Sequence, residues 1–157
     1  MEHNGQSGSK TLANGSRAFV TSQRVRFAHI DPAGIAYFPR IFNFVHEAFE
    51  DLWCDFVCVP YDKLIEEYRI GFPTVHIEAD FKHGLHFGDR PVVEVTCNHI
   101  GHSSVGFCYR YWVGEKLCVE ARTTNACVHL DTMKAIPIAD EYREIFMTIM
   151  EKTAGSD

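Results

Sequence analysis

Apolar residues recur with a helical period between positions 38 and 53, and this segment limits the possible folds more than any other. The spacing i, i+3, i+4, i+7 is typical of one face of an α-helix. The residues that follow it are Phe38, Ile41, Phe42, Val45, Phe49, Leu52 and Trp53. Phe44 and Ala48 widen the apolar face, so we expect a helix that is buried on more than one side.

After Pro73 the apolar period changes to two, which predicts β-strands up to about Leu130. Turns that contain glycine divide this region into four strands. A further strand is expected over residues 18–27, and short helices over residues 61–68 and 139–150. This order indicates an α+β fold in which an antiparallel sheet of about five strands wraps around one long central helix.

The length and composition predict a single globular domain. The chain has 157 residues, and we expect a flexible lead-in over residues 1–17 and one domain over residues 18–152. The lead-in lacks the apolar core of a signal peptide, and no apolar run has membrane-spanning length, so the cytoplasm is the expected location. The net charge of −6, without a basic cluster, argues against a nucleic-acid partner. The six cysteines include no Cys-x-x-Cys pair and are expected to be reduced thiols.

Several short motifs resemble catalytic or metal-binding patterns but lack an essential part. The segment from Gly101 to Gly106, GHSSVG, differs from a GxSxG nucleophile elbow because its second glycine comes one residue late. Strands are expected on both sides of it, so a hairpin turn is favoured. The histidines at positions 76, 83 and 86 lack the cysteine or helical partners of known metal motifs. We therefore expect neither a metal nor a cofactor.

The loop before the long helix carries the chemistry that the sequence supports best. Asp31 is followed by Pro-Ala-Gly34 and then by the start of the helix, whose first amides have no internal acceptors. A thioester carbonyl placed at this helix end would be polarised, with the amides of Tyr37 or Phe38 as donors, since Pro39 has no N–H. Asp31 could then attack the carbonyl or activate a water molecule. On these grounds alone, a simple turn and helix cap is the favoured interpretation.

The segment DPAGIAYFP, residues 31–39, resembles the motif of the 4-hydroxybenzoyl-CoA thioesterase family of hot-dog proteins. The segments LHFGD, residues 85–89, and GHSS, residues 101–104, resemble two turns of that family. The resemblance implies a hot-dog fold, Asp31 as the catalytic carboxylate, and a backbone oxyanion donor at Tyr37 or Phe38. The substrate-binding residues that it implies are Gly34, Ile35, His102, Ser103 and Ser104.

Two departures from the family pattern bear on substrate binding. Many members have a tyrosine or histidine where this chain has Phe38, and some have an Arg/Lys-rich turn where this chain has the nearly uncharged GHSS. Other hot-dog thioesterases place their carboxylate on the central helix, and Glu47 is the alternative for that role.

The resemblance implies hydrolysis of an acyl-CoA to a carboxylic acid and free CoA. The aromatic residues near the motif favour an aromatic or otherwise bulky acyl group. A homo-oligomer, dimer or tetramer, is implied, with the active site at the interface between subunits. Two alternatives stay open: a thioesterase that releases polyketide or fatty acyl chains from a carrier protein, and a non-catalytic hot-dog module that binds acyl groups.

Overall fold

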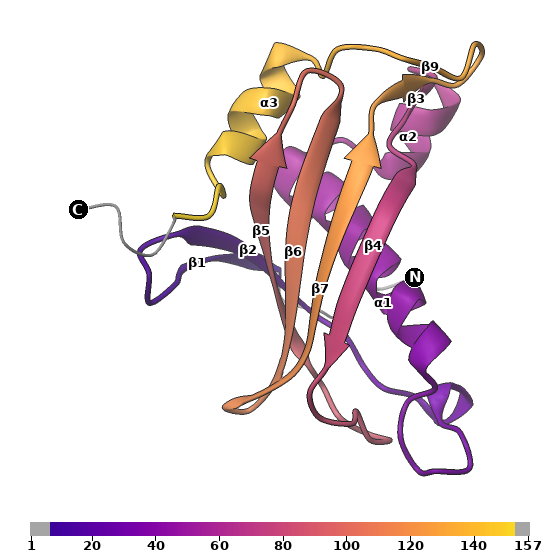
Figure 1. Ribbon diagram of the computed structural model, residues 1–157, viewed down its shortest axis with the longest axis vertical. Coiled ribbons are helices and arrows are strands. Elements are labelled where there is room, and N and C mark those ends of the chain that lie inside the picture. The colour runs from indigo at the N-terminus through magenta and orange to yellow at the C-terminus, as the bar shows by residue number, and fades with distance from the viewer. Residues whose placement is uncertain (1–6, 153–157) are drawn as a thin grey trace.

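The computed structural model describes residues 7–152, and its main feature is a six-stranded antiparallel sheet in the order β1-β2-β5-β6-β7-β4 (Figure 1). A second sheet has three short strands in the order β3-β8-β9. The strands of the large sheet are β1 (Gly8–Thr11), β2 (Arg17–Ser22), β4 (Thr74–Phe81), β5 (Val92–Ile100), β6 (Ser104–Val113) and β7 (Lys116–Ala126). Those of the small sheet are β3 (Ile70–Gly71), β8 (Val128–His129) and β9 (Lys134–Ala135).

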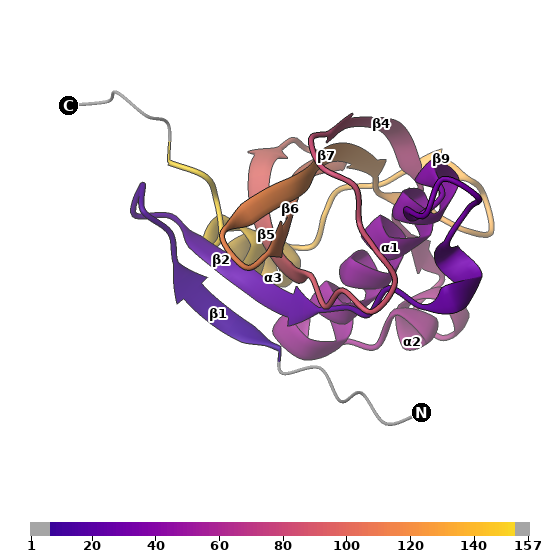
Figure 2. The ribbon, with the colours of Figure 1, turned by 90° about the horizontal axis from the view of Figure 1, so that it is seen from below.

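One long helix lies in the concave face of the large sheet, which curves around it (Figure 2). This arrangement confirms the predicted α+β fold with a central helix. The long helix is α1 (Phe38–Asp51), and it begins at the residue that the apolar period predicted. The other helical segments are η1 (Phe27–His29), η2 (Leu52–Val57), α2 (Tyr61–Glu66) and α3 (Asp140–Met147).

The long helix continues past its α-helical part as a π-helix, η2. A π-turn needs about one residue more than an α-turn, so residues five apart come onto the same face. Leu52 and Val57 are separated by this spacing, and both are buried together with Trp53. The helix ends at Cys58, whose φ of 64° is in the left-handed region.

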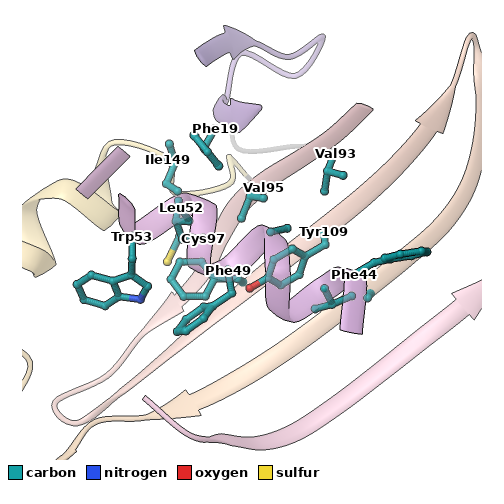
Figure 3. Packing of buried hydrophobic residues seen from close by; sticks show 14 of the residues in the cluster. Phe19, Phe44, Phe49, Leu52, Trp53, Val93, Val95, Cys97, Tyr109 and Ile149 are labelled. Atoms are coloured by element: carbon teal, nitrogen blue, oxygen red, sulfur yellow. The ribbon is translucent and has the colours of Figure 1, made fainter. Parts of the chain in front are cut away.

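The core forms between the helix and the inward faces of the strands (Figure 3). Trp53, near the C-terminal end of the helix, is fully buried, and its ring lies within 5.0–6.4 Å of five aromatic rings. These rings belong to Phe49, Tyr61, Phe72, Tyr142 and Phe146. A buried hydrogen bond of 2.9 Å from the Thr21 hydroxyl to the Asp51 carboxylate also joins β2 to the helix. The helix is therefore held against the sheet both by apolar burial and by polar contacts.

The structure differs from the sequence prediction near the N-terminus. Part of the segment predicted as a flexible lead-in, residues 1–17, forms β1 and the start of β2, because Gly8–Thr11 pair with residues 17–20 of β2. Residues 1–6 lie outside the described residues. The strand predicted over residues 18–27 ends at Ser22, residues 23–26 belong to no helix or strand, and η1 begins at Phe27. With β1 added, the large sheet has six strands rather than about five.

None of the helices within residues 7–152 has both the length and the apolar character needed to cross a membrane.

The six cysteines are free thiols in two different environments. Cys54 and Cys58 are exposed, whereas Cys97, Cys108, Cys118 and Cys127 are buried. Burial raises the pKa of the Cys97 and Cys108 thiols to about 12. Because the thiolate is the reactive form, these buried thiols should react slowly with a thiol reagent.

We therefore expect about two thiols to react rapidly with Ellman's reagent in the native protein, and all six after denaturation without a reductant. The measurement is the absorbance of the released thiolate, on protein kept from air. A denatured count of four or fewer would show a disulfide and would contradict the prediction of reduced thiols.

Candidate active site

Asp31 lies at the base of a tight loop that connects η1 to α1. Its carboxylate Oδ1 accepts a hydrogen bond of 2.8 Å from the Ala33 amide, and its backbone carbonyl accepts one of 2.9 Å from the Gly34 amide. The Asp31 amide donates to the Ile35 carbonyl at 3.0 Å, which closes the loop. Gly34 has a φ of +85°, a conformation that few residues other than glycine adopt readily. The loop therefore orients one carboxylate oxygen and leaves Oδ2 without a donor from residues 7–152.

The Asp31 loop is attached to the segment that follows β4. The Ala36 amide donates to the Leu85 carbonyl at 2.7 Å, and the Tyr37 amide donates to the His29 carbonyl at 2.8 Å. Gly84 lies so close to Ile35 that an added Cβ would be 2.6 Å from Ile35 Cγ2. This contact explains why a glycine stands at position 84, since any side chain there would push the two loops apart.

A cavity of about 420 Å³ lies between the Asp31 loop, the start of α1 and the end of β4. We call it the Asp31 pocket. Its volume falls within the range of pockets for small molecules, roughly 300–1,000 Å³. Most of its wall is apolar, and Lys82 and His83 are its basic residues. The lining residues are Asp31, Ile35, Ala36, Phe38, Ile41, Phe81, Lys82, His83, Gly84, Leu85 and Val119.

The two predicted oxyanion donors differ in their availability. The Tyr37 amide is already used in its hydrogen bond to His29, so it is not free to bind a substrate. Phe38 is the first residue of α1, and no acceptor for its amide occurs within residues 7–152. Phe38 also lines the Asp31 pocket. Of the two predicted donors, Phe38 is therefore the one that the structure leaves open.

The predicted substrate-binding turn His102–Ser104 does not lie near Asp31 in the same chain. This turn joins β5 to β6 at one end of the sheet, and the Asp31 loop lies at the other end (Figure 1). Along β6, Ser104 and Tyr111 are about 23 Å apart at about 3.3 Å per residue, and Tyr111 pairs with Val119 of the Asp31 pocket. The turn has structural contacts instead: the Cys127 amide donates to the Ser103 carbonyl at 2.7 Å, and Arg143 Nη2 donates to the His102 carbonyl at 3.3 Å.

Glu47, the alternative carboxylate, lies in a different cavity from Asp31. This cavity of about 750 Å³ lies between α1, α2 and the segment after β2, and Gln23, Arg26, His29 and Asp51 also line it. Burial raises the pKa of Glu47, and the nearby Asp51 and Glu50 carboxylates raise it further. Within one chain, Glu47 and Asp31 therefore belong to separate sites.

Eight lining residues of the Asp31 pocket were not predicted as site residues. Three of them are consecutive in the chain: Phe81, Lys82 and His83. They come at the end of β4, about fifty positions after Asp31 in the chain. Only the pairing of β4 with β7 brings this segment to the start of the helix. A sequence signal did exist, since two basic residues follow an alternating strand and precede a glycine.

The model of one protein family matches residues 25–146, which is more than half of the chain. The chain belongs to the thioesterase-like superfamily. This assignment supports the predicted resemblance at the level of the superfamily, and the narrower 4-hydroxybenzoyl-CoA thioesterase family stays a prediction.

Two relatives of this thioesterase-like chain are 1,4-dihydroxy-2-naphthoyl-CoA hydrolases from cyanobacteria. The protein from Nostoc punctiforme is 24% identical over 140 residues, which cover 89% of this chain and 94% of the relative. The protein from Synechocystis is 28% identical over 129 residues, which cover 80% of this chain and 91% of the relative.

Solved structures confirm the hot-dog fold. The crystal structure of a 1,4-dihydroxy-2-naphthoyl-CoA thioesterase from Synechocystis has a TM-score of 0.75 and 26% identity, and covers 83% of this chain and 96% of that one. A thioesterase superfamily structure from Jannaschia has a TM-score of 0.81 and 25% identity, with 86% and 94% coverage.

Replacement of Gly34 by valine tests whether the Asp31 loop belongs to the active site. Valine is strained at a φ of +85°, so the loop must change its shape and move Asp31, although no protein atom lies within 4 Å of the added Cβ. We expect Gly34→Val to lose at least about 90% of kcat/KM on an acyl-CoA, with only a modest fall in the unfolding midpoint.

Gly88→Val is the matched control, because Gly88 has a φ of +88° and equally open surroundings but lies outside the Asp31 pocket. Both quantities are measured on the same preparations. A Gly34→Val protein with a lowered midpoint and unchanged turnover would remove the loop from the active site.

Proposed function

We propose that this protein is an acyl-CoA thioesterase that hydrolyses its substrate to a carboxylic acid and free CoA. The observation that carries this proposal is the position of Asp31 in an apolar pocket beside the open N-terminus of α1. The relatives named above act on CoA thioesters, which supports the same substrate class for this chain.

The arrangement supports two routes for the chemical step. In one, the Asp31 carboxylate attacks the thioester carbonyl, CoA leaves as a thiolate, and water hydrolyses the resulting anhydride. In the other, Asp31 removes a proton from a water molecule that attacks the carbonyl, the C–S bond then breaks, and CoA leaves as a thiolate that takes up the proton. In both routes, negative charge develops on the carbonyl oxygen, and the Phe38 amide at the helix end is the proposed donor that stabilises it.

The walls of the Asp31 pocket support an aromatic or bulky acyl group. Phe38, Phe81, Ile41 and Leu85 provide apolar contact area for a ring. The relatives from Nostoc and Synechocystis are named for a bicyclic aromatic acyl group, which points in the same direction. We propose an aryl-CoA as the preferred substrate.

Asp31→Asn tests this function directly. The substitution keeps the shape of the side chain but removes the nucleophile or base, so kcat on benzoyl-CoA should fall by about a hundredfold or more. Release of free CoA is the measurement, and Asp62→Asn, at an exposed carboxylate on α2, is the control. A folded Asp31→Asn protein with near-normal kcat would contradict the role of Asp31.

We also propose that the active protein is a homo-oligomer that pairs through β4. This strand is at the edge of the large sheet, and a second copy of the chain could pair with its free side. Its Val75 side chain is 63% exposed, and Phe38, Phe42 and Phe81 add exposed apolar surface nearby. A subunit on this edge would cover the opening between α1 and β4.

Light scattering should therefore report a dimer or tetramer at micromolar concentration. Val75→Glu places a charge on the proposed interface and should shift the protein towards monomer. Met133→Glu is the matched control, since Met133 is 64% exposed but lies in the turn between β8 and β9. A wild-type protein that is active as a stable monomer would contradict an active site shared between subunits.

A further inference from the structure

A second cavity adjoins the Asp31 pocket at the end of β4. It has a volume of about 750 Å³, and Lys82 and His83 line both cavities. We call it the basic groove. Its lining residues are Lys82, His83, Trp112, Val113, Glu115, Lys116 and Leu117. Because two residues are shared, a long ligand could lie in both cavities at once.

The backbone fixes the two shared residues at the border between the cavities. The amides of Lys82 and His83 both donate to the Cys118 carbonyl, at 2.8 Å and 3.1 Å. Cys118 is a residue of β7, whose first residue is Lys116. The chain after β4 is thus held beside the β6–β7 hairpin, and the basic side chains of both segments line one groove.

The lysines of the groove lack the ion pairs that other basic residues of the sheet have. Arg110 lies 3.1 Å from Glu120 and 3.0 Å from Glu151, and Arg122 also pairs with Glu120. No carboxylate within residues 7–152 comes within 4.0 Å of the ammonium group of Lys82 or Lys116, although Glu115 lines the same groove. Two lysines that line one groove and form no ion pair within residues 7–152 are available to bind an anion.

The groove also has an aromatic residue and an unsatisfied donor. Trp112 lines it, and the buried indole N–H of Trp112 finds no acceptor within residues 7–152. The donors that the groove offers to a ligand are the side chains of Lys82, Lys116 and His83, because the Trp112 N–H is buried. A phosphate is the complementary group because it offers only acceptors, and an aromatic ring beside it can stack on a base.

We propose that the basic groove binds the phosphorylated nucleotide end of a CoA thioester while the acyl end occupies the Asp31 pocket. This inference rests on the proposed function, since it assigns the two ends of the same substrate to two adjoining cavities. It also gives the anionic substrate a local attraction in a protein whose net charge is −6. The uncharged turn His102–Ser104, at the opposite end of the sheet, offers no such attraction.

The test compares two substrates that share one acyl group. Benzoyl-CoA carries the nucleotide, and the benzoyl thioester of N-acetylcysteamine lacks it. In the groove variant Lys116→Glu, whose residue lines the basic groove but not the Asp31 pocket, we expect KM for benzoyl-CoA to rise at least about tenfold, because an attraction to the phosphates becomes a repulsion. kcat should stay within about twofold, and KM for the truncated thioester should not change.

Lys63→Glu is the matched control, since it changes the net charge equally and lies outside the groove. The inference is overturned if the groove variant keeps its KM for benzoyl-CoA, or if both substrates weaken equally. Those results leave the proposed function intact, provided that the wild-type protein hydrolyses benzoyl-CoA.

A binding measurement tests the basic groove independently of the proposed thioesterase activity. By calorimetry, adenosine 3′,5′-bisphosphate should bind the wild-type protein and bind the groove variant at least about tenfold more weakly. Equal binding of inorganic phosphate and of the nucleotide would overturn the assignment to a nucleotide. A wild-type protein that binds the nucleotide through Lys116 but hydrolyses no acyl-CoA would support the groove and contradict the thioesterase.

Discussion

The enclosure of one wide apolar helix by a curved antiparallel sheet is the constraint on which the rest of the structure depends. Trp53 and its five aromatic neighbours can leave water only if the sheet, α2 and α3 all pack around the same helix. The π-helical turns of η2 extend this apolar face, and they keep Leu52, Trp53 and Val57 buried together. The position of every loop at the two ends of the sheet follows from this packing.

The candidate site is built where the enclosed helix begins. The packing of α1 against the sheet fixes the direction of its first amides, and the hydrogen bond from Ala36 to Leu85 fixes the Asp31 loop beside them. Local hydrogen bonds thus position the Asp31 carboxylate, whereas packing in the core positions the end of the helix. A rigid support of this kind is what a preorganised oxyanion site requires.

The sequence predicted those features that depend on local pattern. The 3.6-residue period located the start of α1 at Phe38, and the period of two located the strands after Pro73, because side-chain burial repeats with the backbone geometry. Features that depend on pairing between distant segments were missed. β1 exists because it pairs with β2, and Lys82 reaches the Asp31 pocket because β4 pairs with β7. The role of the turn His102–Ser104 in substrate binding stays a prediction: within one chain the turn lies at the other end of the sheet from Asp31 (Figure 1), so a shared site would need the turn of a second subunit.

The enclosure of the helix also has a consequence for hydrogen exchange. Amides in the core-facing strands and in α1 are bonded within regular structure, so their exchange with solvent requires opening of the whole domain. The Asp31 loop has a few turn hydrogen bonds and exposed residues on both sides of Gly34, so it can open by itself. Two very different exchange rates should therefore meet within the first turn of α1, since the Phe38 amide itself has no acceptor within residues 7–152. The outer residues of the Asp31 loop should then exchange through local fluctuation, on a timescale much faster than unfolding, while the helix behind them exchanges only when the domain opens.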